Sequence, residues 1–248
     1  MRLSLVPFVV YIAFVFVFLS CSNNSEPGDP GEKVFTLQRT IPLSFGEPSD
    51  ISFGADYNSL WTVSGKTNRI YLIDLNGNIL RTLNYSGDDI EGIAFDRADS
   101  TLWIAEEKER TVLHLNLNGE VLKKKVINIF GLPNNGPEGI CLDNNNHIYL
   151  LNEKNPDAIY VLDKKLNLLE ERELKFAKDY TGIDFVDGLF YIVSDESKTL
   201  TFFDPIKGPI NSYNLPFTKF EGVAVHKDKS TFYLLNDSLA TLYEYKLK

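Results

Sequence analysis

The stretch Asp-Ile-Glu-Gly-Ile-Ala-Phe-Asp at 89–96 recurs as Gly-Pro-Glu-Gly-Ile-Cys-Leu-Asp at 136–143 and as Lys-Phe-Glu-Gly-Val-Ala-Val at 219–225. Two weaker copies fill the gaps, Ser-Asp-Ile-Ser-Phe at 49–53 and Tyr-Thr-Gly-Ile-Asp-Phe at 180–185. The anchor positions of the copies are 41, 47, 43 and 40 residues apart, and they are Asp50, Glu91, Glu138, Thr181 and Glu221. A period of this length indicates a repeat architecture.

Each copy of the signature is followed by further runs that read as strands, because they are rich in aromatic and branched residues. The second runs are 60–63, 102–105, 148–151, 190–193 and 232–235. The third runs are 69–75, 112–117, 158–162, 200–203 and 241–246, and the fourth are 79–83, 121–127, 168–174 and 210–215. Asn-Gly pairs at 76–77 and 118–119 are strong hairpin signals. No sustained 3.6-residue apolar period follows residue 30, so we expect little helix.

Four antiparallel strands in a repeat of about 43 residues are typical of a β-propeller blade. The last repeat has only three strands, and residues 34–43 read as a strand with no repeat of its own. Pairing that strand into the last blade would hide two sheet edges. The sequence therefore predicts an all-β, five-bladed β-propeller closed by its N-terminal strand, with a domain spanning 33–248.

The N-terminal segment predicts that the propeller is located outside the cytoplasm. Residues 3–20 are almost wholly apolar, and Cys21 follows at once, which resembles a lipoprotein signal at 1–20 and a lipidated Cys21. The alternative is an uncleaved membrane anchor, since such a run could nearly span a bilayer. Residues 21–32 have the composition of a flexible tether. We expect a propeller of the bacterial cell envelope held by a lipid anchor, with the outer membrane favoured.

Charge and cysteine content narrow the partners. The formal net charge is −9, which argues against a nucleic-acid partner and is compatible with cations or basic ligands. If Cys21 carries lipid, Cys141 stands alone in an inner strand, where a small buried apolar role is expected. A closed ring needs no partner to cover its edges, so we expect a monomer.

The candidate site is a ring of acidic residues at one mouth of the propeller channel. Successive strands are antiparallel, so the start of each first strand and the end of each second strand lie on the same face. A carboxylate follows the end of four of the five second strands. The side chains expected at this mouth are Asp50, Glu91, Glu107, Glu138, Glu153, Asp195, Glu221 and Asp237.

Crowded carboxylates raise one another's pKa or require a counter-charge. Three arrangements satisfy that requirement. The first is a Ca²⁺ ion held by carboxylate and amide oxygens. The second is a purely structural lattice, with Lys108, Arg110, Lys154 and Lys198 close enough in sequence to neutralise the mouth. The third is a site for a basic or polyhydroxyl ligand.

The repeat resembles a known family. The Glu-Gly-Ile/Val-Ala start, followed by Leu-Trp-Ile-Ala-Glu-Glu at 102–107 or Ile-Tyr-Leu-Leu-Asn-Glu at 148–153, is similar to the SdiA-regulated family of bacterial β-propellers, which includes cell-envelope proteins. More distantly, it resembles six-bladed propellers such as gluconolactonase-type lactonases and propeller phytases. The lactonases hold a divalent metal at one channel mouth, and the matching positions here are Glu91, Glu138, Asn152 and Glu221. The count of five repeats departs from that pattern.

Two functions remain open on the sequence. The first is a binding module located in the cell envelope, which binds a small ligand or Ca²⁺ through the acidic side chains at the channel mouth. The alternative is a metal-dependent hydrolase of phosphoesters or lactones, in which the metal would lower the pKa of a water molecule. The sequence favours binding, because a phosphate-handling site should bring basic residues to the mouth.

Overall fold

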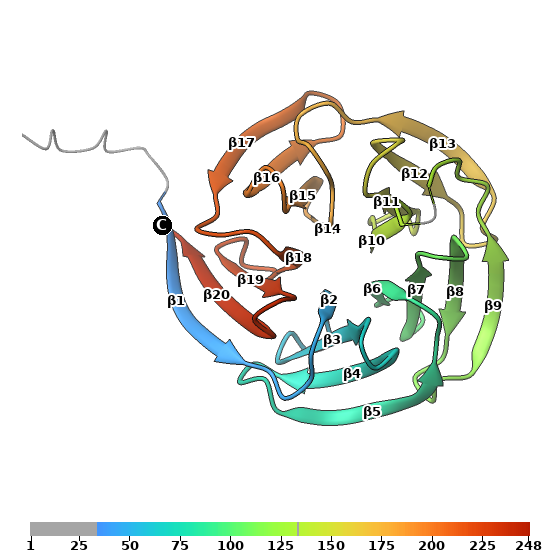
Figure 1. Ribbon diagram of the computed structural model, residues 1–248, viewed down its shortest axis with the longest axis horizontal. Helices are drawn as coiled ribbons and strands as arrows, with labels where there is room; N and C mark the ends of the chain where they lie inside the picture. The colour runs from blue at the N-terminus through green and yellow to red at the C-terminus, as the bar shows by residue number, and fades with distance from the viewer. Residues whose placement is uncertain (1–33, 133) are drawn as a thin grey trace, which may run out of the picture. The chain divides into compact units, whose positions relative to one another are not determined.

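The protein is a five-bladed β-propeller, seen in a computed structural model that describes residues 34–132 and 134–248. The described residues form strands and turns and contain no helix. Five separate four-stranded sheets surround a central channel, and the first strand of each blade lies innermost (Figure 1). The predicted fold class is therefore confirmed.

Each blade is a meander of antiparallel strands. Blade 1 contains β2 (Pro48–Phe53), β3 (Ser59–Ser64), β4 (Arg69–Asp74) and β5 (Ile79–Ser86). Blade 2 contains β6 (Ile90–Asp96), β7 (Thr101–Glu106), β8 (Thr111–Leu115) and β9 (Val121–Val126). Blade 3 contains β10 (Pro137–Leu142), β11 (Ile148–Asn152), β12 (Ala158–Leu162) and β13 (Leu168–Glu173). Blade 4 contains β14 (Gly182–Val186), β15 (Leu189–Ser194), β16 (Thr199–Asp204) and β17 (Gly208–Asn214).

Blade 5 joins the two ends of the described chain. It contains β18 (Phe220–Val225), β19 (Thr231–Asn236) and β20 (Thr241–Leu247), and its outer strand is β1 (Phe35–Pro42). β1 pairs antiparallel with β20 from Phe35 opposite Leu247 to Pro42 opposite Thr241. The ring thus closes as the sequence predicted, and the last blade leaves no edge of β20 unpaired.

The hydrophobic core is divided among the five junctions between blades. Each of the five buried clusters combines side chains of two neighbouring blades. The cluster between blades 2 and 3, for example, packs Trp103 against Ile148 and Leu150, all three of them fully buried. Cys141 is a buried free thiol in the cluster between blades 3 and 4. Residues 33–248 form one compact unit whose strands all pair within it, so this part of the chain has what it needs to fold alone.

The predicted signal at 1–20, the lipidated Cys21 and the tether at 21–32 lie outside the described residues. Among the residues that are described, no helix has the length and apolar character needed to cross a membrane. The expectations of a lipid anchor, an envelope location and a monomer stay predictions.

Candidate functional site

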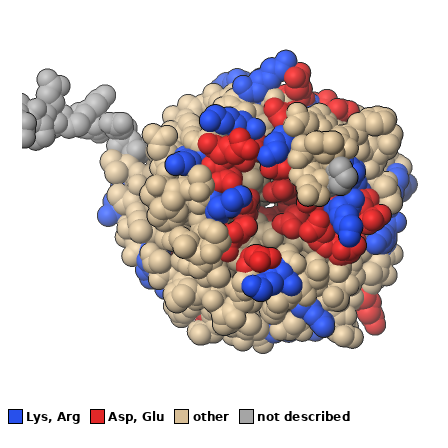
Figure 2. Space-filling model, in the orientation of Figure 1, with Lys and Arg blue, Asp and Glu red and all other residues tan. Residues whose placement is uncertain are grey.

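An acidic pocket opens at one end of the channel, where the first strands begin and the second strands end. Its cavity volume is about 210 Å³. Figure 2 shows Asp and Glu side chains gathered around the central hollow, with a few Lys and Arg among them. The residues that line this acidic pocket are Glu91, Glu107, Glu138, Glu153, Asp179, Thr181, Asp195, Lys219, Glu221 and Asp237.

A β-bulge turns each signature glutamate into the pocket. The pairing between first and second strands skips one residue at Glu91, at Glu138 and at Glu221. A bulge leaves the extra residue outside the ladder and re-aims its side chain. The signature therefore encodes a local break in the strand, and the break explains why these three glutamates point toward the channel mouth.

The glycine of the signature is required by the close approach of neighbouring first strands, and not by the pocket. A Cβ on Gly92 would lie 2.6 Å from the Glu138 carbonyl oxygen, and one on Gly182 would lie 2.4 Å from the Glu221 carbonyl oxygen. Both values are shorter than real Cβ contacts. Neighbouring inner strands thus approach so closely that only glycine fits at this position.

At the ends of the second strands, two adjacent residues have different roles. Glu107, Glu153, Asp195 and Asp237 line the acidic pocket, as predicted from their spacing. In blades 4 and 5 the residue just before them caps the next turn instead: Ser194 Oγ accepts the Ser197 amide at 3.1 Å, and Asn236 Oδ1 accepts the Leu239 amide at 3.0 Å. A polar side chain that bonds a nearby backbone amide in this way fixes a turn.

Asn152, expected among the metal ligands, occupies the corresponding strand-end position in blade 3 and does not line the pocket. It is fully buried, and its Nδ2 donates to the carbonyls of Asn135, Lys154 and Pro156. The Asn155 amide, which would match the cap at Asn236, donates to Asp157. Asn152 Oδ1 therefore has no hydrogen-bond partner among the described residues. Its position is set by the turn and not by the pocket.

Asp50 also lies away from the acidic pocket. The pair Pro48–Ser64 in blade 1 matches the pair Ile90–Glu106 in blade 2, so Ser49 stands at the position of Glu91 and Asp50 at the position of Gly92. The buried Asp50 carboxylate therefore lies against the first strands themselves, where it accepts the amides of Ile51 at 2.8 Å and Ile93 at 2.9 Å. Asp50 is a link between blades 1 and 2 and not part of the predicted ring.

Two residues of the acidic pocket escaped the sequence reasoning, namely Asp179 and Lys219. Each stands two positions before an anchor, Thr181 or Glu221. Asp179 accepts hydrogen bonds from Ser194 Oγ and the Glu196 amide, so blade 4 supplies a carboxylate although its anchor is threonine. Comparing the residue two before each anchor would have found both.

Lysines neutralise one side of the acidic pocket more than the other. Lys219 Nζ lies 2.9 Å from Asp195 and 3.6 Å from Glu221. Lys154 Nζ lies 2.8 Å from Glu153 and 3.1 Å from Glu196. The other basic residues considered from the sequence act elsewhere: Lys108 pairs with Asp88, Arg110 donates to the Leu132 carbonyl, and Lys198 forms no ion pair within the described chain.

The signature glutamates hold their protons unusually tightly. Burial, reinforced by nearby carboxylates, raises the pKa of Glu91 to about 8. Burial likewise raises the pKa of Glu221 to about 8, although Lys219 opposes the shift. The pKa of Glu138 is raised well above its ordinary value, first by burial and then by repulsion from the carboxylates around it. These groups therefore favour either a proton or a bound cation.

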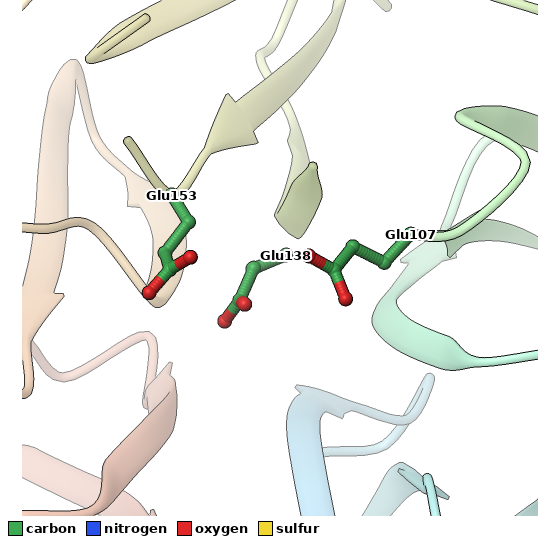
Figure 3. A group of neighbouring side chains, drawn as sticks. All are labelled: Glu107, Glu138 and Glu153. Carbon is green, nitrogen blue, oxygen red and sulfur yellow. The ribbon is translucent and has the colours of Figure 1, made fainter. Parts of the chain in front are cut away.

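Three carboxylates of the acidic pocket lie close to one another. Glu107, Glu138 and Glu153 each offer an oxygen, and the three oxygens lie within 4.8 Å of one another (Figure 3). Glu107 Oε1 also accepts the Gly136 amide at 2.9 Å, which fixes that side chain across the junction between blades 2 and 3. No hydrogen bond or ion pair reaches the Glu138 carboxylate from the residues that the structure describes. Such a trio can hold a hard cation.

These features define a five-bladed propeller with an acidic pocket at one channel mouth. The chain belongs to the SdiA-regulated family, whose model matches residues 33–224. No curated protein matches this sequence.

Several solved structures share the propeller fold. Glutaminyl cyclase of Myxococcus xanthus is 15% identical, with a TM-score of 0.68 over 87% of this chain and 97% of that chain. A protein of unknown function from Bacteroides thetaiotaomicron is 13% identical, with a TM-score of 0.61 over 88% of this chain and 77% of that one. An inactive virginiamycin B lyase from Staphylococcus aureus, solved with quinupristin, is 16% identical, with a TM-score of 0.53 over 84% of this chain and 69% of that one. At these identities the likeness concerns the fold alone.

Proposed function

We propose that this protein is a cell-envelope binding propeller whose acidic pocket takes up Ca²⁺ through Glu107, Glu138 and Glu153. The observation that carries the proposal is the approach of three carboxylate oxygens to within 4.8 Å of one another. Ca²⁺ binds oxygens at 2.3–2.6 Å, so two ligand atoms on one ion lie at most about 5 Å apart. The trio is therefore close enough to share a single ion.

The charge distribution of the pocket supports the same position. On the side of blades 4 and 5, Lys219 already pairs with Asp195 and Glu221. On the side of blades 2 and 3, only Lys154 approaches the trio, and it can keep Glu196 as a partner when Glu153 binds an ion. The uncompensated negative charge thus gathers at Glu138. A divalent cation there would replace the protons that burial otherwise favours.

The cell-envelope address rests on the N-terminal sequence. The apolar run at 3–20 and Cys21 favour a lipid-anchored protein, preferably of the outer membrane, with the propeller outside the cytoplasm. Calcium in the extracellular range of concentrations would be available to such a site. The hydrolase alternative gains no support from a particular contact, because Lys219 in the pocket and Lys154 beside it are both held in ion pairs with carboxylates.

The test is thermal unfolding of residues 33–248 at pH 8 with and without 5 mM CaCl₂. A ligand at 100 times its Kd adds about 2.7 kcal/mol, which corresponds to a Tm rise of about 5–10 °C for a chain of this size. We expect Glu138→Gln to abolish most of the rise. The matched control is Glu120→Gln, an exposed glutamate at the other end of the blades, which should keep it. An unchanged Tm in the unsubstituted protein would refute the proposal.

A further inference from the structure

A second pocket lies at the opposite end of the channel, where the first strands end. Its cavity volume is about 300 Å³, and the loops after β2, β6 and β10 form it together with β14. Its walls include the aromatic rings of Tyr57, Phe95 and Phe185. We call this the aromatic pocket. A smaller cavity of about 40 Å³ continues from it into the channel and shares Phe95, Arg97, Leu142 and Phe185 with it.

Arg97 is the central charged group of the aromatic pocket. Its Nη2 donates to the carbonyls of Phe53 and Gly54, both at 3.1 Å. Its guanidinium carbon stands 4.3 Å from the centre of the Tyr57 ring, and Lys227 Nζ stands 5.2 Å from the same ring. These contacts hold the guanidinium in place by hydrogen bonding and cation–π attraction. Nε and Nη1 donate to no acceptor within the described chain, so each of these nitrogens keeps an N–H donor for a single hydrogen bond to a ligand.

The carboxylates of the aromatic pocket, in contrast, already have partners. Asp96 pairs with Lys164 at 2.5 Å and accepts Trp103 Nε1 at 3.1 Å. Asp143 accepts the amides of Asn145 and His147 at 2.8 Å. Asp184, in the smaller cavity, accepts the amides of Phe185 and Val225. The group with unused hydrogen-bonding capacity is therefore the cation and not the anions.

We propose that the aromatic pocket binds a planar aromatic anion, with its carboxylate on the free donors of Arg97 and its ring against Phe185 and Leu142. A hydrogen bond from a guanidinium to a carboxylate is charge-assisted and therefore stronger than one to a neutral acceptor. Ligand sites combine an apolar, aromatic lining with a few placed polar groups, and this pocket has both. Asn144 and Asn146 line its rim, where their amides can meet polar atoms on the ligand's edge. The site lies at the other end of the channel from the acidic pocket and selects the opposite charge.

The test compares three probes that share one ring and differ in charge: indole-3-acetate, indole-3-acetamide and tryptamine. Each is titrated into residues 33–248 by calorimetry or by saturation-transfer NMR. We expect indole-3-acetate to bind about tenfold more tightly than the amide, because a hydrogen bond between two charged groups is stronger than one to a neutral carbonyl. Tryptamine should bind most weakly. Arg97→Gln should remove the preference for the anion, and Arg97→Lys should retain part of it.

Two controls make the outcome decisive. Arg69→Gln removes an arginine at the start of β4, at the other end of the blade, and should leave the affinity for indole-3-acetate unchanged. Arg97→Lys preserves the charge, so a fold defect of Arg97→Gln can be separated from a loss of recognition by comparing their Tm values. The proposal is overturned if tryptamine binds as tightly as indole-3-acetate, if no probe binds at 10 mM, or if a folded Arg97→Gln keeps the anion preference.

Discussion

At Glu138, burial and the crowding of other carboxylates act on one side chain. The bulge in β10 turns its side chain into the acidic pocket, and Glu91, Glu107, Glu153 and Glu221 all raise its pKa after burial has done so. No basic side chain of the described residues pairs with it. A carboxylate in this situation either keeps its proton at neutral pH or gives it up to a cation. The protonation state of the Glu138 carboxylate therefore links the stability of the protein to pH and to cation binding.

The raised pKa values predict that the calcium-free propeller loses stability as pH rises. Burial raises the pKa of Glu91 from 4.5 to about 8, so the folded state binds more protons than the unfolded state between these values. That contribution is full below about pH 4.5 and is lost as pH climbs through about 8. The Tm measured in EDTA should fall across this window.

The Glu91→Gln variant should show a flatter profile, because Gln mimics the protonated form at every pH. Each pKa unit at one site corresponds to about 1.4 kcal/mol, and 1 kcal/mol to about 2–4 °C of Tm. At pH 9 the variant should therefore melt at least about 5 °C above the unsubstituted protein, and at pH 5 the two should agree. Glu173→Gln, at an exposed glutamate, is the control. Parallel Tm profiles for Glu91→Gln and the parent would contradict the assignment.

Sequence reasoning at this scale found the pocket glutamates and one of their counter-charges, Lys154, and missed Lys219. The recurrence of Glu91, Glu138 and Glu221 at one repeat position was visible because a repeat places equivalent residues equivalently. The pairing of Lys219 with Asp195 crosses a blade junction, 24 residues apart in sequence. A side chain that long can reach several carboxylates, so its choice depends on distances that spacing alone does not give.

The inner strands set the geometry on which both pockets depend. The first strands begin at the acidic end of the channel, four of the five with a bulge, and the loops after β2, β6 and β10 form the aromatic pocket at the other end. Between them, the signature glycine lets neighbouring first strands pack backbone to backbone. A larger residue there would push adjacent blades apart at the channel wall, because close-packed interiors have no room for an added methyl group.

Gly182→Ala tests this close approach. Its new Cβ would stand 2.4 Å from the Glu221 carbonyl oxygen, and backbone cannot move aside as a flexible side chain does. We expect a loss near the upper end of the overpacking range, about 3 kcal/mol, or about 6–12 °C in Tm. Gly188→Ala is the matched control, because nothing lies within 4 Å of its Cβ. That control should cost only the strain of a positive φ, about 1 kcal/mol. Equal losses in the two variants would show that steric contact is not the cause.

Strand positions were predictable and strand registers were not. Alternating apolar runs and Asn-Gly turns located the strand ends to within three residues, because both signals are local. The position of Asp50 depends on its register across the bulge in β2, whereas Asn152 is held by the turn after β11. A shift of one residue sends a side chain to the other face of a strand. An alignment that matched Asp50 with Glu91, one residue out of register, therefore misplaced Asp50.

At the scale of the whole molecule, side chains of the outer strands form hydrogen bonds to the next blade. In four of the five junctions, a basic side chain of the outer strand donates to the turn between the third and fourth strands of its neighbour. The donors are Arg39 to Asn76, Arg81 to Asn118, Lys123 to Lys164 and Arg172 to Pro205. The junction from blade 4 to blade 5 has no such turn to latch, because β20 and β1 are not joined by a hairpin. That junction is held instead by its buried cluster and by contacts such as the ion pair between Lys219 and Asp195.

A disulfide across that closure should stabilise the whole ring. Thr36 and Lys246 are Cα partners in the β1–β20 ladder, and the positions are 210 residues apart in sequence. Antiparallel partners have Cα separations of about 4.5–5.5 Å, within the range of a disulfide. In the chain-entropy account, closing a loop of more than 100 residues adds up to about 5 kcal/mol. The pair Thr36→Cys and Lys246→Cys should therefore raise the oxidised Tm by at least about 5 °C.

The measurement also decides whether the N-terminal strand is the weak point of the fold. If β1 separates from β20 before the blades unfold, the crosslink should also slow proteolysis of the native protein, since local opening exposes an edge. The reduced double variant is the control, and it should melt slightly below the parent because the ion pair between Lys246 and Asp228 is lost. Oxidised and reduced forms that melt together would mean that the blades unfold with the closure intact, and that ring stability resides in the core clusters at the junctions.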